Sequence, residues 1–215
     1  SGKIFVPRTE AEIWQELDKF IGMASVKAEI RSIVDDIKET KRSKGNDVQV
    51  EIRDHFVFTG NPGTGKTTMA RCFADILNAL GVLPKGHLVE VGSKDLIGDV
   101  IGASERNVRE AVDKSMGGIL FIDEAYGLND GTSYGQGAID TLLKLVEDNR
   151  GKFICILAGY SKEMGDFMRQ NSGLESRFNK VIDFPDYNAR ELEAIFRITL
   201  KSKGFTLDSE AEENI

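Results

Sequence analysis

Hydrophobic residues gather in five short, near-continuous runs along this chain, separated by polar and glycine-containing segments. Continuous runs of Val, Ile, Leu and Phe are typical of strands that are buried on both faces of a parallel sheet, whereas half-buried strands alternate. The pattern therefore predicts five strands, at His55–Phe58, His87–Val91, Ile119–Ile122, Phe153–Ala158 and Lys180–Phe184.

Helical periodicity fills the gaps between these strands. Apolar residues recur at intervals of three and four in the segments 69–80, 104–116 and 139–146, which gives each segment one hydrophobic face. Gly81 is expected to end the first of these helices, and Ser104 to cap the start of the second. Strands that alternate with helices predict a doubly wound α/β fold around a parallel five-stranded sheet.

Further helical patterns lie outside this core. One helix is expected from Thr9 and another from about Ser25, whose charged end leads into a loop at Gly45–Asp47. After the last strand, a helical pattern runs from Ala189 to Lys203, and another begins near Asp208. These patterns place helices before and after the sheet.

A glycine-rich loop joins the first strand to the next helix. It reads Gly60-Asn61-Pro62-Gly63-Thr64-Gly65-Lys66-Thr67-Thr68 and matches G-x-x-x-x-G-K-[ST]. Glycines permit a backbone path whose N–H groups face a polyphosphate, and the helix N-terminus directs partial positive charge at the same anion. Lys66 is expected to reach the β- and γ-phosphates of ATP, and the Thr67 hydroxyl to hold Mg²⁺. Because a strand and a helix flank the pattern, a phosphate loop is favoured over a glycine-rich turn without chemistry.

Two carboxylates, Asp123 and Glu124, end the third apolar run. Ligands bind outside the carboxyl ends of the strands in open α/β sheets. Asp123 is expected to contact Mg²⁺ directly or through water, and Glu124 to orient and polarise the attacking water. The alternative is an acidic pair that only caps a helix start, which the nearby phosphate loop disfavours. The pair therefore predicts ATP hydrolysis in addition to binding.

Composition and charge limit the class of protein, its compartment and its partners. Its 215 residues, of which 40% are hydrophobic and 29% charged, suit a globular domain. We expect a cytoplasmic protein, because no apolar run reaches the ~20 residues that span a bilayer and no secretory leader is visible. The net charge of −7 argues against a broad nucleic-acid surface. Cys72 and Cys155 are expected to be buried, and His55 and His87 lack the spacing of metal ligands.

In this order, the motifs resemble those of AAA+ ATPases, and more narrowly the group that contains red-type Rubisco activase and stage V sporulation protein K. The resemblance extends from about Leu17 to Leu192 and is specific to the family more than to the subgroup. The stretches that carry it are Phe20–Lys27, Phe58–Thr68, Gly117–Tyr126, Ile156–Tyr160, Gly173–Phe178 and Asp183–Tyr187.

The resemblance implies several roles beyond the phosphate loop. Ile21 and Gly22 fall in the segment that lies against adenine in the family. Arg177 matches the arginine finger, which reaches into the neighbouring subunit's site and offsets charge on the γ-phosphoryl group. Arg169 is the alternative finger. Family members form hexameric rings that pull polypeptide through a central pore, so self-association and a protein client are the expected partners.

This sequence also departs from the family pattern. The corresponding pore loop is Leu96–Gly102, in which Val100 stands where close relatives carry an aromatic residue, so the grip on a client is expected to be weaker. Alternatively, Val100 and Ile101 are ordinary packing residues. The sensor position after the fourth strand carries no Asn or Thr, and its role falls on Tyr160 or Ser161.

Three segments and three functions follow from this interpretation. Residues 1–16 are expected to form a helical leader, 17–187 the AAA+ nucleotide-binding subdomain, and 188–215 the beginning of an incomplete helical lid. The leading hypothesis is an ATP-hydrolysing ring that remodels a protein client. The alternatives are an ATP-dependent assembly switch or scaffold with weak mechanical activity, and a nucleic-acid motor or loader, which the acidic balance disfavours.

Overall fold

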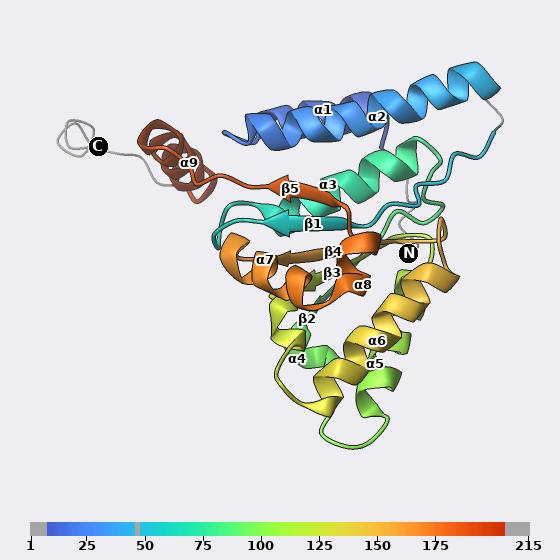
Figure 1. The fold of residues 1–215 in the computed structure, drawn as a ribbon. Helices are drawn as coiled ribbons and strands as arrows, with labels where there is room; N and C mark the ends of the chain where they lie inside the picture. Colours follow the sequence, from blue (N-terminus) through green and yellow to red (C-terminus); the bar gives the residue numbers. More distant parts are fainter. Residues whose placement is uncertain (1–7, 46–47, 205–215) are drawn as a thin grey trace, which may run out of the picture.

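A parallel five-stranded sheet forms the centre of the computed structural model, which describes residues 8–45 and 48–204 (Figure 1). The strand order is β2-β3-β4-β1-β5, and every neighbouring pair is parallel. All five predicted strands are confirmed to within one residue at each end. They are β1 (Phe56–Thr59), β2 (Leu88–Gly92), β3 (Ile119–Asp123), β4 (Ile154–Gly159) and β5 (Lys180–Asp183).

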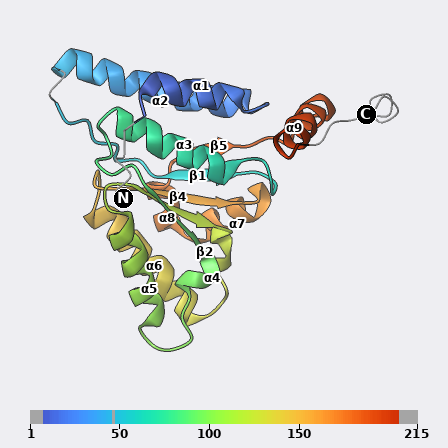
Figure 2. The same ribbon diagram turned by 180° about the vertical axis from the view of Figure 1, so that it is seen from behind.

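Two separate hydrophobic cores lie on the two faces of the sheet. Side chains alternate along each strand, so Phe56 and Phe58 of β1 enter one core and Val57 enters the other. The first core is covered by α1 (Glu10–Lys19), α2 (Ala24–Lys44) and α3 (Lys66–Ala79). The second is covered by α5 (Ala103–Ser115), α6 (Ser133–Asp148), α7 (Ser161–Gln170) and α8 (Ser172–Arg177), and Figure 2 shows both layers from behind. The doubly wound fold is therefore confirmed.

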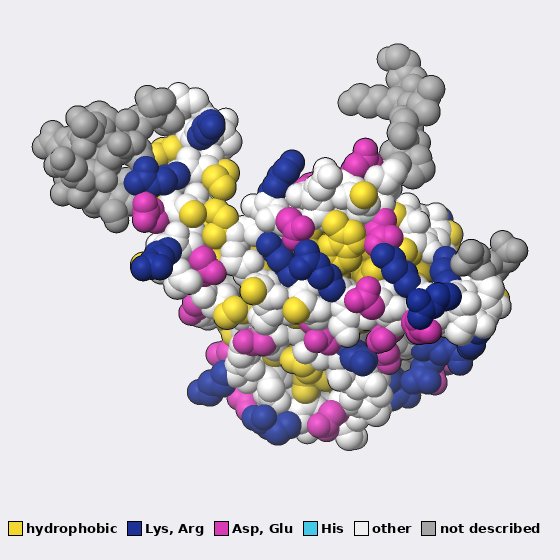
Figure 3. Space-filling view, turned by 90° about the horizontal axis from the view of Figure 1, so that it is seen from above, with side chains coloured by type: hydrophobic (Ala, Val, Ile, Leu, Met, Phe, Trp, Pro, Cys, Tyr) yellow, Lys and Arg dark blue, Asp and Glu magenta, His cyan; other side chains and the backbone are white. Residues whose placement is uncertain are grey.

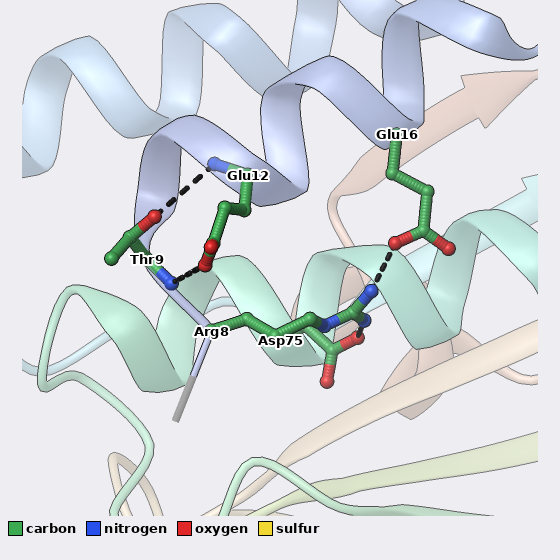
Figure 4. A network of polar contacts seen from close by, with 5 residues as sticks. All are labelled: Arg8, Thr9, Glu12, Glu16 and Asp75. Atoms are coloured by element: carbon green, nitrogen blue, oxygen red, sulfur yellow. Dashed lines mark hydrogen bonds and ion pairs between the residues drawn. The ribbon is translucent and has the colours of Figure 1, made fainter. Parts of the chain in front are cut away.

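Helix α1 packs as part of the first core. Ile13 and Leu17 are buried in it, and a capping box between Thr9 and Glu12 fixes its first turn. Arg8 forms ion pairs with Glu16 on the same helix and with Asp75 on α3 (Figure 4). The helix continues unbroken across residues 16 and 17, so a leader that ends at residue 16 remains a prediction about domain division rather than a visible boundary.

The predicted cap at Ser104 is wrong. Helix α5 begins at Ala103 behind Gly102, whose φ of 80° places it in the left-handed region. Ser104 lies inside the first turn and is buried, and its hydroxyl accepts a hydrogen bond of 2.9 Å from the backbone N–H of Gly98. The serine therefore anchors the segment before the helix, a contact that a local capping rule does not anticipate.

That segment connects the short helix α4 (Ser93–Leu96) to α5 and exposes hydrophobic side chains. Ile101 is 94% exposed and Val100 is 56% exposed. The interpretation of these two residues as packing residues is therefore wrong. Exposed aliphatic side chains at one loop are available for contact with a partner.

Helix α9 (Ala189–Ser202) confirms the helical pattern after the sheet and projects from the body of the molecule in Figure 1. None of its residues is buried, and Leu192, Phe196 and Ile198 expose much of their surface. Figure 3 shows hydrophobic side chains at the surface of the projecting helix. The helix predicted near Asp208 and part of the loop at Gly45–Asp47 lie outside the described residues. No described helix is both long and apolar enough to cross a bilayer.

His55 is buried between the second core and the start of β1. Its Nδ1 accepts a hydrogen bond of 3.0 Å from the backbone N–H of Cys155, and its ring lies 5.5 Å from that of Phe178. Burial lowers the pKa of His55 to about 4. The histidine is therefore neutral in the folded protein at neutral pH. Cys72 and Cys155 are both free and buried, as predicted.

We expect the folded state to lose about 2 kcal/mol of stability between pH 7 and pH 4.5 because of His55 alone. In this range the unfolded chain protonates the histidine near its ordinary pKa of 6.5, whereas the folded chain resists protonation down to about 4. Stability is thus complete above pH 6.5 and falls as the pH drops. Urea unfolding of wild type and His55→Gln at both pH values measures the effect. An equal pH dependence in the two proteins would exclude it.

Candidate nucleotide site

The phosphate loop lies between the end of β1 and the start of α3, and its path depends on glycine. The backbone N–H of Gly60 donates a 3.1 Å hydrogen bond to the carbonyl of Gly159, which ties the loop to the end of β4. A Cβ atom on Gly60 would lie 2.4 Å from the Phe184 carbonyl oxygen, and one on Gly65 would lie 2.2 Å from Cε of Met23. Both glycines also have positive φ angles, so side chains there would clash and strain the backbone.

Lys66 is held across this loop. Its ammonium group donates hydrogen bonds to the carbonyl oxygens of Gly60, at 2.7 Å, and Asn61, at 2.8 Å. Burial lowers the pKa of Lys66, and the negative charge of Asp123 acts in the opposite direction. An ammonium group has three donors on a flexible stem, so Lys66 can exchange these carbonyls for phosphate oxygens without moving the loop.

A cavity of about 340 Å³ brings the phosphate loop and the acidic pair together at the carboxyl ends of the strands. The residues that line this cavity come from three separate segments of the sequence, which follow β1, β3 and β4. This is the crevice in which ligands bind in open α/β sheets. The lining residues are Gly60, Pro62, Gly63, Gly65, Lys66, Thr67, Thr68, Asp123, Glu124, Tyr126, Gly159 and Tyr160.

The two carboxylates in this cavity differ in their surroundings. Asp123 is half-buried at the end of β3, and its side chain accepts a 3.0 Å hydrogen bond from the backbone N–H of Glu124. Glu124 is exposed to the cavity and has φ 48° and ψ 44°, a left-handed conformation that costs a residue with a Cβ on the order of 1 kcal/mol. Strained backbone of this kind often accompanies a functional side chain.

Thr67 and Asp123 line the same cavity and fit a Mg²⁺ ion bound together with a nucleotide. A hydroxyl and a carboxylate are oxygen ligands, and Mg²⁺ sites commonly use one or two protein ligands and complete the shell with phosphate oxygens and water. The sequence assigned both residues to this role, and the structure brings them to one site.

Asn61 and Thr64 do not line the cavity, although the loop motif includes them. The Asn61 side chain donates hydrogen bonds of 2.8 and 2.9 Å to the carboxylate of Asp186, whereas the Thr64 hydroxyl is buried and donates to the Asn61 carbonyl at 2.7 Å. Their side chains therefore shape the loop. Any contact with phosphate comes from their backbone N–H groups.

Ile21 and Gly22 also lie outside the cavity lining. Gly22 has a φ of 69°, and a Cβ atom there would lie 2.8 Å from Oε1 of Glu191 and 3.3 Å from the ring of Tyr187. The Tyr187 hydroxyl in turn donates a 3.4 Å hydrogen bond to the carbonyl of Thr64. The predicted adenine segment is therefore adjacent to the loop, and its contact with a base remains a prediction.

Two tyrosines in the cavity wall extend the predicted site. Tyr126 carried no predicted role, although an aromatic residue just after an acidic pair was a usable signal. Burial raises the pKa of Tyr126 to about 12, and the carboxylate of Glu124 adds to the rise. Of the two alternatives for the sensor position, Tyr160 lines the cavity, whereas the Ser161 hydroxyl donates a 3.3 Å hydrogen bond to Asp183.

Arg177 lies on α8, away from the cavity formed by its own chain. Its Nε is 3.3 Å from Oε2 of Glu147 on α6, and another guanidinium nitrogen donates a 3.1 Å hydrogen bond to the Gly173 carbonyl. The alternative finger, Arg169, is exposed at the end of α7 and forms an ion pair with Asp166. Neither arginine lines the cavity, so neither contacts a ligand there in this conformation.

A phosphate loop, an acidic pair and this strand order define a P-loop nucleotide-binding fold, and comparison with known families agrees. Residues 56–186 match the family described as "ATPase family associated with various cellular activities (AAA)". The chain belongs to this AAA family. The predicted resemblance is therefore confirmed.

Several individual proteins of known name are similar to most of this chain. The chain is 43% identical over 204 residues to stage V sporulation protein K of Bacillus subtilis, covering 94% of this chain and 63% of that protein. It is 42% identical over 206 residues to protein CbbX of Cereibacter sphaeroides, covering 94% and 67%. It is 39% identical over 211 residues to the chloroplastic ribulose bisphosphate carboxylase/oxygenase activase of Cyanidioschyzon merolae, covering 94% and 71%. The chain thus spans about two thirds of the length of these relatives.

A solved structure supports the fold independently. The FIGL-1 AAA domain, determined in complex with ADP, superposes with a TM-score of 0.60 at 18% identity, covering 86% of this chain and 60% of that one. At this identity the likeness concerns the fold alone.

Proposed function

We propose that this chain is an ATP-hydrolysing AAA+ domain that couples ATP binding and hydrolysis to remodelling of a protein client, as part of a hexameric ring. One observation carries the proposal: Lys66, Thr67, Asp123 and Glu124 line the same cavity although the sequence separates them. This set supplies the cation, the metal ligands and the carboxylate that hydrolysis of a nucleoside triphosphate needs.

Each residue has a separate task in this proposal. Backbone N–H groups of Gly63, Thr64 and Gly65 and the Lys66 ammonium bind the phosphates, and the Thr67 hydroxyl and Asp123 carboxylate would hold Mg²⁺. A Mg²⁺ ion held by these two residues would supply positive charge that offsets the charge of the phosphates. Glu124 projects into the cavity and accepts a hydrogen bond from the attacking water, which orients the water toward the phosphorus and withdraws its proton.

The position of Arg177 supports the proposed assembly into a ring. The guanidinium is outside the cavity of its own chain, which favours a catalytic role in the cavity of a neighbouring chain. In a closed ring every subunit offers its finger to one neighbour and receives one from the other. The apolar residues of α9, which the body of the molecule leaves exposed, suit the start of a lid that packs on further structure.

A protein client is supported by the exposed loop before α5 and by the relatives' names. Ile101 and Val100 present aliphatic surface at this loop, and one relative is named as an activase of another enzyme. The aliphatic tip offers less contact area than an aromatic ring, which keeps the second candidate, an ATP-dependent assembly switch, in consideration. Client-stimulated hydrolysis would favour remodelling, whereas stimulation by single-stranded DNA or RNA would point to a nucleic-acid motor.

The metal ligand provides a direct test of the proposed site. We expect Asp123→Ala to weaken ATP binding in Mg²⁺ by about tenfold or more and to change binding in EDTA less than about twofold. In Mg²⁺ the variant lacks a metal ligand, which weakens ATP binding. In EDTA it lacks a negative charge that repels the metal-free polyphosphate, so ATP binding is not weakened in the same way. Titration of a fluorescent ATP analogue in both buffers measures the two affinities. Asp140→Ala, an exposed aspartate on α6, is the matched control, and equal losses in both buffers would contradict the metal role.

A further inference from the structure

Tyr126 and Tyr160 form an aromatic pair in the cavity wall. Tyr126 belongs to the short 3-10 helix η1 (Ala125–Leu128) after β3, whereas Tyr160 follows β4 and precedes α7. Their ring centroids are 6.0 Å apart and their planes are inclined by 26°, which is a stacked arrangement. Both residues line the cavity together with Glu124 and Lys66.

The Tyr126 ring is fixed by a second contact. A Cβ atom on Gly159 would lie 2.8 Å from Cε1 and 2.9 Å from Cδ1 of Tyr126, so the ring lies directly against the glycine that ends β4. The carbonyl of this glycine accepts the hydrogen bond from Gly60 that begins the phosphate loop. Tyr126 therefore packs between the end of β4 and the side chain of Tyr160, and it comes from the same turn as Glu124.

The hydroxyl groups of this pair take no part in holding the fold together. Both tyrosines are half-buried, and within residues 8–45 and 48–204 neither phenol forms a hydrogen bond with another residue. A half-buried phenol at a cavity edge can exchange hydrogen bonds with water for hydrogen bonds with a ligand. The Tyr160 phenol, which borders the cavity without a protein partner, is available to a ligand.

We propose that Tyr126 is a positioning residue of this site: its ring holds the Tyr160 side chain at the cavity, where the Tyr160 hydroxyl donates a hydrogen bond to a phosphate oxygen of bound ATP. The inference rests on the proposed ATPase function. The half-buried Tyr160 side chain follows the buried end of β4, and the stack with Tyr126 restricts its rotamers before the substrate binds. Preorganised donors contribute to rate because no reorganisation is needed at the moment of reaction.

Kinetics of a small set of variants test this relation. Tyr126→Phe keeps the ring and is expected to retain kcat within about twofold, whereas Tyr126→Leu is expected to lower kcat about tenfold with little change in KM for ATP. Tyr160→Phe removes the donor and is expected to lower kcat by a similar factor. Because Tyr126 acts through Tyr160, the double variant Tyr126→Leu/Tyr160→Phe should be no slower than the slower single variant. Independent, multiplying losses would overturn the proposal.

A spectroscopic measurement separates this proposal from the ATPase function on which it rests. The chain contains four tyrosines, so ¹³C-labelled tyrosine rings give few signals, and Tyr160→Phe identifies that of Tyr160. In nucleotide-free protein, Tyr126→Leu should shift and broaden the Tyr160 ring signal, whereas Tyr126→Phe should shift it little. Tyr134→Leu, a half-buried tyrosine outside the cavity, is the matched control. An unchanged Tyr160 signal in Tyr126→Leu overturns the proposal even if the protein hydrolyses ATP. The expected shifts without any hydrolysis by wild type would leave the pair intact and refute the ATPase function.

Discussion

Glu124→Gln is expected to bind ATP with nearly wild-type affinity and to hydrolyse it at least about 100-fold more slowly. The amide has almost the shape of the carboxylate, but it no longer accepts a proton from the attacking water. Lys66→Ala should instead fail at ATP binding. It removes the ammonium group that lies across the phosphate loop, so it should lose most of its affinity for ATP and, with it, hydrolysis.

Nucleotide affinity and turnover measured on both variants separate binding from water activation. Glu110→Gln, an exposed glutamate on α5 outside the cavity, is the matched control and should behave as wild type. If Glu124→Gln retains turnover close to that of wild type, this carboxylate does not activate water. If Lys66→Ala retains ATP affinity, the phosphate loop does not act as proposed.

Much of this fold was predictable because its signals are local and repeated. The three central strands, β1, β3 and β4, are nearly continuous apolar runs, since strands of a parallel sheet covered on both faces have no polar side to show. The helices show one apolar face each, and α1 and α9 begin within one residue of their expected starts, Thr9 and Ala189. The prediction for Ser104 was wrong because a serine hydroxyl can either cap a helix or accept a hydrogen bond from a preceding loop. Its hydroxyl serves a loop that folds back over the helix, and this choice depends on tertiary contacts.

The residues of the site likewise include some that were predictable from the sequence and some that were not. Lys66, Thr67, Asp123 and Glu124 were predictable because the carboxyl ends of parallel strands meet at one edge of the sheet, whatever the detailed packing. The contact between Tyr126 and Tyr160 depends on how two rings fill the space beside Gly159, which no spacing rule encodes. The ion pair of Arg177 with Glu147 is likewise a matter of how α8 lies on α6. Sequence thus located the chemistry at strand ends, while side-chain packing determined its surroundings.

Mixing two inactive variants is expected to restore ATP hydrolysis if Arg177 acts in the neighbouring subunit. An Arg177→Ala subunit retains an intact cavity, and a Glu124→Gln or Lys66→Ala subunit retains an intact finger. Each variant alone should be nearly inactive, with losses on the order of 10³-fold for the finger. In an equal mixture of freely exchanging subunits, roughly a quarter of the head-to-tail interfaces pair an intact finger with an intact cavity. Recovery should approach that fraction of wild-type activity.

The experiment is done on assembled protein, with subunit exchange confirmed by a labelled variant. Glu124→Gln is the better partner if assembly itself requires bound ATP, because it should keep the nucleotide. Arg169→Ala replaces an exposed arginine on the neighbouring helix α7 and serves as the control. If Arg169 were the finger, Arg169→Ala would be inactive alone and would complement Glu124→Gln, whereas Arg177→Ala would stay active.

Recovery of ATP hydrolysis in the mixture is expected only if Arg177 acts in the cavity of a neighbouring subunit. The Arg177 guanidinium lies beside Glu147 and outside the cavity of its own chain. An arginine that only supports its own fold would leave every Arg177→Ala cavity defective, so mixing could not repair it. A finger that swung into its own cavity would give the same negative result, because each subunit would still lack one essential group. Co-assembled mixtures that remain inactive would therefore remove the main support for a ring in which catalysis is shared between neighbours.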